Sequence, residues 1–143
     1  MAGSGDKMAE MIDLVAKRGI ADKFHFPGFM RGKQVQEMLA MSDVYIMPSV
    51  SEPFGISPLE AMQVGCPSII SHQSGCAEIL QHAIKTDYWD IDAMADAIYA
   101  IVKYPAMYKS LHELGMAEVN NIKWADAGLK VRRIYDGVIN HTL

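Results

Sequence analysis

The sequence predicts an α/β protein in which a parallel sheet is covered by helices on both faces and the C-terminal third is helical. Short, mostly apolar segments alternate with segments of helical periodicity through residues 1–90, and only helical patterns follow. Ligands of such sheets bind beyond the carboxyl ends of the strands. The candidate binding loops therefore follow Met1, Phe26, Met47 and Ser71.

Strands are predicted where a short segment is apolar, or alternates polar and apolar residues, and then meets proline, glycine or serine. Asp43–Pro48 is typical of a buried parallel strand. Residues 84–90 are interpreted as a loop. The expected strands are a strand end within Met1–Asp6, Lys23–Phe26, Asp43–Pro48 and Pro67–Ser71.

Helices are predicted where apolar residues recur every three or four positions. Ile91–Lys103 has the clearest pattern, and its inward residues are expected to be Met94, Ala95, Ile98, Ile101 and Val102. The other expected helices are Met8 to Gly19, Val35 to about Ser42, Ser57 to about Val64, Ser74 to about Gln81, Met107–Glu118 and Trp124–Ile139.

Composition indicates one globular domain over residues 1–143. The formal net charge of −4, without any lysine- or arginine-rich run, argues against nucleic-acid and membrane-surface binding. The apolar stretches are too short for a transmembrane segment, and residues 1–20 lack the pattern of a signal peptide. We therefore expect a cytoplasmic protein.

The residues that most often bind metals show no metal-ligand spacing. Cys66 and Cys76 are expected to be free, buried thiols. The histidines are expected to have surface or packing roles, and no metal or other cofactor is predicted. The histidines are His25, His72, His82, His112 and His141.

The segment Ser49–Met62 carries the strongest chemical signal, because it follows a buried strand and opens a helix. Gly55 allows a close approach to the backbone. The first amides of the helix at Ser57 are free donors that suit a phosphate or a hydroxyl.

Glu52 and Glu60, eight positions apart, place two carboxylates beside these amides. Carboxylates accept hydrogen bonds from sugar hydroxyls in defined directions. Glu60 has an alternative explanation, since it can complete a capping box with Ser57 while Pro58 occupies the first helical position. No capping role can be constructed for Glu52.

Six segments, in order, resemble family 4 glycosyltransferases and their glycogen- and sucrose-synthase relatives. The resemblance spans nearly the whole chain. The signature combines a glutamate, a Phe-Gly turn, a second glutamate eight positions on, Ala-Met and Gly-x-Pro. The matching segments are Ala2–Gly5, Phe26–Gly28, Ser42–Val44 with Pro48 and Ser49, Ser51–Met62 with Gly65–Pro67, Ser74–Glu78, and Trp124 with Tyr135.

The resemblance implies the C-terminal, Rossmann-like domain of a GT-B fold, which binds a nucleotide-sugar donor. The family's first strand of this domain and its N-terminal acceptor domain are missing here. An arginine and a lysine that hold the diphosphate in the family are missing with them. Residues 84–90 replace the family's Asn-Gly-x-Leu stretch. The chain alone is therefore expected to be inactive.

The resemblance also implies residue roles. Glu52 would bind hydroxyls of the transferred sugar beside the reacting carbon, and Glu60 would bind the ribose. The other expected donor-binding positions are backbone positions. They are Gly3 and Gly5 in the first loop, Pro27 and Gly28 facing the base, and Phe54, Gly55, Ile56 and Ser57 facing the sugar and diphosphate.

The expected activity is that of a retaining, hexosyltransferase-type glycosyltransferase of carbohydrate biosynthesis. It would use a UDP-, ADP- or GDP-sugar and an acceptor glycan, without a metal. The alternative is a non-catalytic nucleotide-binding or regulatory module of the same fold. A third reading, a phosphorylase or epimerase, lacks recognisable phosphate or cofactor residues.

Overall fold

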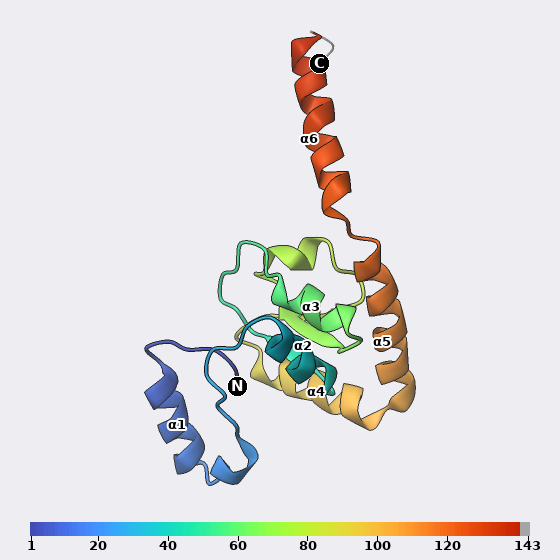
Figure 1. Cartoon of the computed structure of the whole chain (residues 1–143). Helices are drawn as coiled ribbons and strands as arrows, with labels where there is room; N and C mark the ends of the chain where they lie inside the picture. Colours follow the sequence, from blue (N-terminus) through green and yellow to red (C-terminus); the bar gives the residue numbers. More distant parts are fainter. Residues whose placement is uncertain (141–143) are drawn as a thin grey trace. The chain divides into compact units, whose positions relative to one another are not determined.

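The computed structural model describes residues 1–140, so the predicted packing or surface role of His141 falls outside the described residues. The chain divides into two compact units, Met1–Met38 and Leu39–Leu143. Figure 1 shows the succession of their elements along the chain.

The first unit contains α1 (Met8–Lys17), a short 3₁₀ helix η1 (Ala21–Lys23) and most of α2 (Lys33–Ala40). The predicted strand Lys23–Phe26 is wrong, because η1 occupies its start. Extended residues follow, and they meet the first loop through the hydrogen bond from the Met1 amino group to the His25 carbonyl and through a single parallel bridge between Gly28 and Ala2. A strand needs regular pairing along its length, which these two contacts do not supply.

The second unit is built on a parallel sheet of three strands in the order β1-β2-β3. The strands are β1 (Tyr45–Met47), β2 (Ser68–Ser71) and β3 (Ile84–Thr86), and Ile69 of β2 pairs with Ile46 on one side and Ile84 on the other. All four residues of β2 are buried. Since alternate side chains point to opposite faces, both faces of the sheet are covered there, as predicted.

The strand β3 lies within residues 84–90, which the sequence pattern assigned to a loop. It has only three residues, and Lys85 interrupts its apolar character. Its pairing with β2 makes it a strand, which is tertiary information that local periodicity lacks.

Helices α3 (Ser57–Gln63), α4 (Ile91–Lys103) and α5 (Pro105–Asn120) surround this sheet. α3 packs on β1 and β2, α4 packs on β2 and β3, and α5 packs on both helices. The predicted helix from Ser74 to Gln81 is shorter, because only the 3₁₀ helix η2 (Gly75–Glu78) forms.

The inward face of α4 is narrower than its sequence predicts. Ile101 is buried, whereas Ala95 and Val102 are exposed. α5 covers only part of this helix, so the neighbouring apolar positions lie outside the contact. Both thiols are buried and free as expected, and Cys76 belongs to the main core cluster with Met47 and Ile70.

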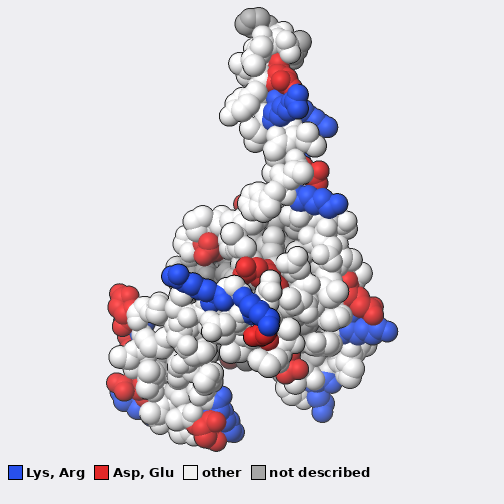
Figure 2. Space-filling model, in the orientation of Figure 1, with Lys and Arg blue, Asp and Glu red and all other residues white. Residues whose placement is uncertain are grey.

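Helix α6 (Trp124–Ile139) has the predicted bounds but buries none of its residues. Trp124 is 84% exposed, and Arg132 pairs with Asp136 at 3.8 Å. Figure 2 shows basic and acidic side chains interspersed along this helix. Among the described residues no helix combines the length and apolar character that a membrane span requires.

Glu118 of α5 joins this helix to the turn that precedes β3. Its carboxylate accepts hydrogen bonds from the amides of Gln81 at 2.7 Å and His82 at 2.9 Å, and it contacts His82 Nδ1 at 3.0 Å. Burial alone would raise the pKa of Glu118, but these hydrogen bonds hold that pKa below its ordinary value. The charged carboxylate therefore stabilises the fold.

We expect Glu118→Gln to lower the free energy of unfolding at pH 7 by about 1–2 kcal/mol, because hydrogen bonds to a charged acceptor are lost. In wild type, the depressed pKa of Glu118 contributes stability that is fully present above the unfolded-state pKa of this carboxyl group. That stability is lost as pH falls through the folded-state pKa. The variant should therefore lose less stability than wild type on acidification. Urea denaturation between pH 3 and 7 measures both effects.

Glu113→Gln is the matched control, since Glu113 lies exposed on the same helix and, among residues 1–140, its carboxylate pairs only with Lys109, at 3.8 Å. Exposed ion pairs of this kind contribute little. Equal losses in the two variants at every pH would contradict the role assigned to Glu118.

Candidate functional site

The loop after β1 is held by the turn that follows β2. The Gly75 amide donates to the Glu52 carbonyl at 2.9 Å, and the Cys76 amide donates to the Phe54 carbonyl at 2.7 Å. The Ser71 hydroxyl donates to the Ser49 carbonyl at 2.6 Å. Three successive anchors therefore determine the course of the loop that carries Glu52.

Two glycines make this close approach possible. At Gly75 a Cβ atom would lie 2.1 Å from the carbonyl oxygen of Pro53. Gly55 has φ +89°, and a Cβ atom there would lie 2.9 Å from Met47 Cε and 3.2 Å from Glu52 Cγ. A side chain at either position would therefore clash with neighbouring atoms of the protein. At Gly55 the positive φ also favours glycine.

The predicted capping box at the start of α3 does not form. Ile56 is the residue before the helix, and no side chain caps it. The Ser57 hydroxyl instead accepts a hydrogen bond from the Tyr45 hydroxyl at 2.8 Å. Tyr45 can reach the Ser57 hydroxyl, in place of a backbone amide of the helix, because β1 packs directly against α3. The capping explanation for Glu60 is therefore excluded.

Glu60 is exposed, and within residues 1–140 its carboxylate has no hydrogen bond or ion pair. The backbone amides of Gly55, Ile56 and Ser57 likewise have no acceptor among the described residues. Glu52 is half-buried, and the only hydrogen bond of its carboxylate in that range is a long one, 3.5 Å from Oε1 to the Phe54 amide. Donors and acceptors thus remain available around the loop.

The Gly55 turn lies between the two glutamates. Glu52 Cγ is 3.2 Å from the Cβ position of Gly55, and Glu60 lies in the first turn of the helix that follows. Burial raises the pKa of Tyr45, the hydrogen bond to Ser57 opposes this, and the charges of Cys76, Glu60 and Glu52 raise it further.

The other predicted site residues belong to the first unit. The Gly3 amide donates to the Gly28 carbonyl at 2.8 Å, and these glycines have φ +117° and +76°. Pro27 precedes this bridge, and Gly5 has open space at its Cβ position. The glycine turn and the Pro27-Gly28 segment are thus adjacent to each other.

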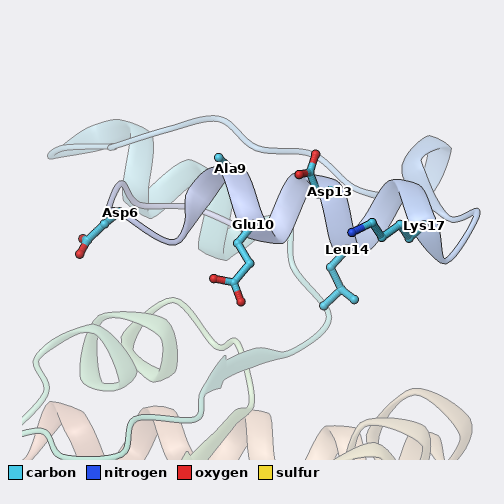
Figure 3. Close-up of a pocket in the computed structure, with 6 residues that line it drawn as sticks. All are labelled: Asp6, Ala9, Glu10, Asp13, Leu14 and Lys17. Atoms are coloured by element: carbon cyan, nitrogen blue, oxygen red, sulfur yellow. The ribbon is translucent and has the colours of Figure 1, made fainter.

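A hollow of about 530 Å³ lies along α1, lined by residues of this one helix and by Asp6, two positions before its start. Figure 3 shows the side chains that line it, and none is a predicted site residue. They are Asp6, Ala9, Glu10, Asp13, Leu14 and Lys17. In the described part of the chain, no cluster of three or more histidine, cysteine or acidic residues is arranged to hold a metal ion.

A parallel sheet with its candidate ligand loop beyond the strand ends defines a Rossmann-like α/β domain. The family described as glycosyl transferases group 1 matches residues 1–117. The chain belongs to this family.

Known proteins resemble the chain in sequence and in fold. The N-acetyl-alpha-D-glucosaminyl L-malate synthase of Bacillus anthracis is 32% identical over 117 residues, covering 79% of this chain and 30% of that protein. A sucrose-phosphate synthase from Thermosynechococcus elongatus is 25% identical, with a TM-score of 0.81, covering 96% of this chain and 36% of its own. The HepE protein of Anabaena in complex with UDP-glucose is 17% identical, with a TM-score of 0.82, covering 95% and 40%.

The chain spans between about a fifth and a third of the length of three curated relatives that it matches. Its fold is that of the GT-B neighbours. The activity of the whole protein is therefore a matter for proposal.

Sequence reasoning missed Tyr45 and the role of Gly75. Tyr45 was included in a buried strand, where nothing marks one aromatic residue as a hydrogen-bond donor to a helix. Gly75 was recognised only as part of a turn. The spacing of Gly75 after a strand end was the available signal, but its partner, the Pro53 carbonyl, lies 22 positions earlier.

We expect Gly75→Ala to lower the free energy of unfolding by about 1–3 kcal/mol, because a methyl group must displace backbone in a packed region. The displaced atom is the Pro53 carbonyl oxygen, so the Glu52 loop should move as well. Urea denaturation measures the first effect, and the amide chemical shifts of Glu52, Phe54 and Gly55 measure the second.

Gly128→Ala is the control, since its Cβ position in α6 is open. Alanine in a helix interior is favoured over glycine by about 0.5–1 kcal/mol, so this variant should lose nothing. Unchanged stability and unchanged loop shifts in Gly75→Ala would contradict the tight contact.

Proposed function

We propose that this chain is the donor-binding domain of a retaining glycosyltransferase of the hexosyltransferase type. The longer protein would transfer a sugar from a nucleotide-sugar to an acceptor glycan or a related molecule. Membership of the glycosyl transferases group 1 family supports sugar transfer. The acceptor site would belong to the rest of that protein.

The observation that carries the proposal is the pair Glu52 and Glu60 around the Gly55 turn. Neither carboxylate has a strong partner within the described residues. A sugar nucleotide presents hydroxyl donors on its sugar and its ribose, which match two separate acceptors. Free amides between the carboxylates offer complementary donors to a diphosphate.

The proposed roles follow this division. Glu52 binds hydroxyls of the transferred sugar beside the reacting carbon, and Glu60 binds the ribose. The amides near Phe54, Gly55, Ile56 and Ser57 face the sugar and the diphosphate. Gly3, Gly5, Pro27 and Gly28 approach the nucleotide through their backbone.

Departure of the nucleotide leaves negative charge on its diphosphate. Protein donors that are oriented before the reaction stabilise such charge without a metal ion. The proposed transferase therefore uses neither a metal nor an organic cofactor. Its donor is a UDP-, ADP- or GDP-sugar, and its place is the cytoplasm, in carbohydrate biosynthesis.

UDP is the first nucleotide to test, since it forms part of the ligand of the Anabaena neighbour. We expect ligand-observed NMR to detect selective binding of one among UDP, ADP, GDP and CDP. Glu60→Ala should weaken this binding by about tenfold or more, since it removes a charged hydrogen-bond acceptor. Glu113→Ala, which removes an exposed glutamate of α5, should have no effect.

Equal binding by wild type and Glu60→Ala would argue against the proposed ribose contact. Binding that also survives loss of both glutamates would favour a nucleotide-binding module without transferase activity. The titration is done first on the chain as described and then on the longer protein.

The two glutamates should differ in which part of the donor they recognise. We expect Glu52→Ala to lower the affinity for UDP-glucose by about tenfold and to leave the affinity for UDP unchanged, because only the sugar contacts Glu52. Glu60→Ala should weaken both ligands equally. Isothermal titration or NMR titration with the two ligands measures the difference, and equal responses in Glu52→Ala would refute the assignment.

A further inference from the structure

The Tyr45 hydroxyl connects the sheet to the start of the helix that follows the Glu52 loop. Tyr45 itself lies outside the family motif Ser51–Met62. Tyr45 lies at the start of β1, and its hydroxyl donates to the Ser57 hydroxyl at 2.8 Å. Ser57 is the first residue of α3, and its hydroxyl also lies 3.8 Å from Met47 Sδ at the end of β1. The start of the helix is therefore tied to its neighbouring strand by side chains.

The hydrogen bond between Tyr45 and Ser57 stands where a helix cap would otherwise be expected. No side chain caps the α3 N-terminus, and the residues just before it have no backbone hydrogen bonds through their amides within residues 1–140. The helix has only seven residues, so little of its order comes from its own hydrogen bonds. The contact with Tyr45 thus has a large share in setting where the helix begins.

The position of Ser57 determines what this contact can orient. Residues three apart are neighbours on one face of a helix, so the side chains of Ser57 and Glu60 lie together. The Tyr45 hydroxyl therefore contacts the helix start three residues before Glu60, through Ser57.

We propose that Tyr45 and Ser57 are positioning residues, whose hydrogen bond holds Glu60 in the orientation required for the nucleotide. The inference rests on the proposed function, since it assigns Glu60 a ligand. Tyr45 makes its contribution through Ser57 and the helix start. Removing either hydroxyl should release the same constraint.

Tyr45→Phe and Ser57→Ala test the inference by two measurements. The affinity for UDP should fall by about threefold to tenfold in each variant, as expected for one hydrogen bond. The double variant should bind UDP no more weakly than either single variant, because the two hydroxyls form one interaction. Ser57→Thr keeps a hydroxyl group and should restore the wild-type affinity, which a purely steric effect would not do.

The second measurement needs no ligand. The Glu60 amide donates to the Ile56 carbonyl at 3.1 Å, the first hydrogen bond of α3. Its hydrogen exchange should become about threefold to tenfold faster in Tyr45→Phe, as expected for the loss of one supporting hydrogen bond. The Met94 amide, which makes the corresponding bond to Asp90 in α4, should exchange at the wild-type rate.

Tyr108→Phe is the matched control. Tyr108 stacks on His112 at 5.9 Å, and its hydroxyl has no hydrogen bond within the described residues. This variant should match wild type in both measurements.

The outcomes separate the two proposals. If Glu60→Ala abolishes UDP binding while Tyr45→Phe changes neither measurement, the positioning role is overturned and the proposed function stands. If no variant or wild type binds UDP, exchange of the Glu60 amide still decides whether Tyr45 holds the helix. Faster exchange only in Tyr45→Phe and Ser57→Ala supports the inference, and exchange at the wild-type rate overturns it.

Discussion

The pair of backbone hydrogen bonds between the loop after β1 and the turn after β2 is the constraint on which the candidate site depends. The Glu52 and Phe54 carbonyls accept hydrogen bonds from the Gly75 and Cys76 amides. This short, strand-like contact extends the sheet past its regular end. The loop is thereby ordered by main-chain atoms, and the Glu52 side chain remains available.

This close approach of two backbone segments explains why small residues surround the site. Serine and glycine bring two backbone segments within hydrogen-bond distance, and buried hydroxyls such as Ser71 and Ser74 satisfy each other at 2.9 Å. Thr86 has the only buried side-chain oxygen without a hydrogen-bond partner in the part of the chain that the structure describes. Polar groups at this end of the sheet are therefore nearly all used for internal order, in contrast to the two glutamates.

The fold class, the helices α4, α5 and α6, and the strands β1 and β2 are predictable from the sequence, because they depend on hydrophobic periodicity and on nearby glycine, proline and serine residues. Prediction failed at Lys23–Phe26 and at β3, where the decision depends on whether a neighbouring strand exists. The candidate loop was identified from spacing. Its internal contacts were not, since the capping pattern at Ser57 describes a helix in isolation, and Tyr45 belongs to another element.

The order of the strands has a consequence for how the second unit folds. Each strand pairs with the next one along the chain, as Ile46 with Ile69 and Ile69 with Ile84. Each pairing closes a loop of moderate length, and the entropic cost of loop closure grows only slowly with the number of residues. The loop that carries Glu52 is held by the Gly75 and Cys76 amides, so its ordered form requires the chain to have folded as far as η2.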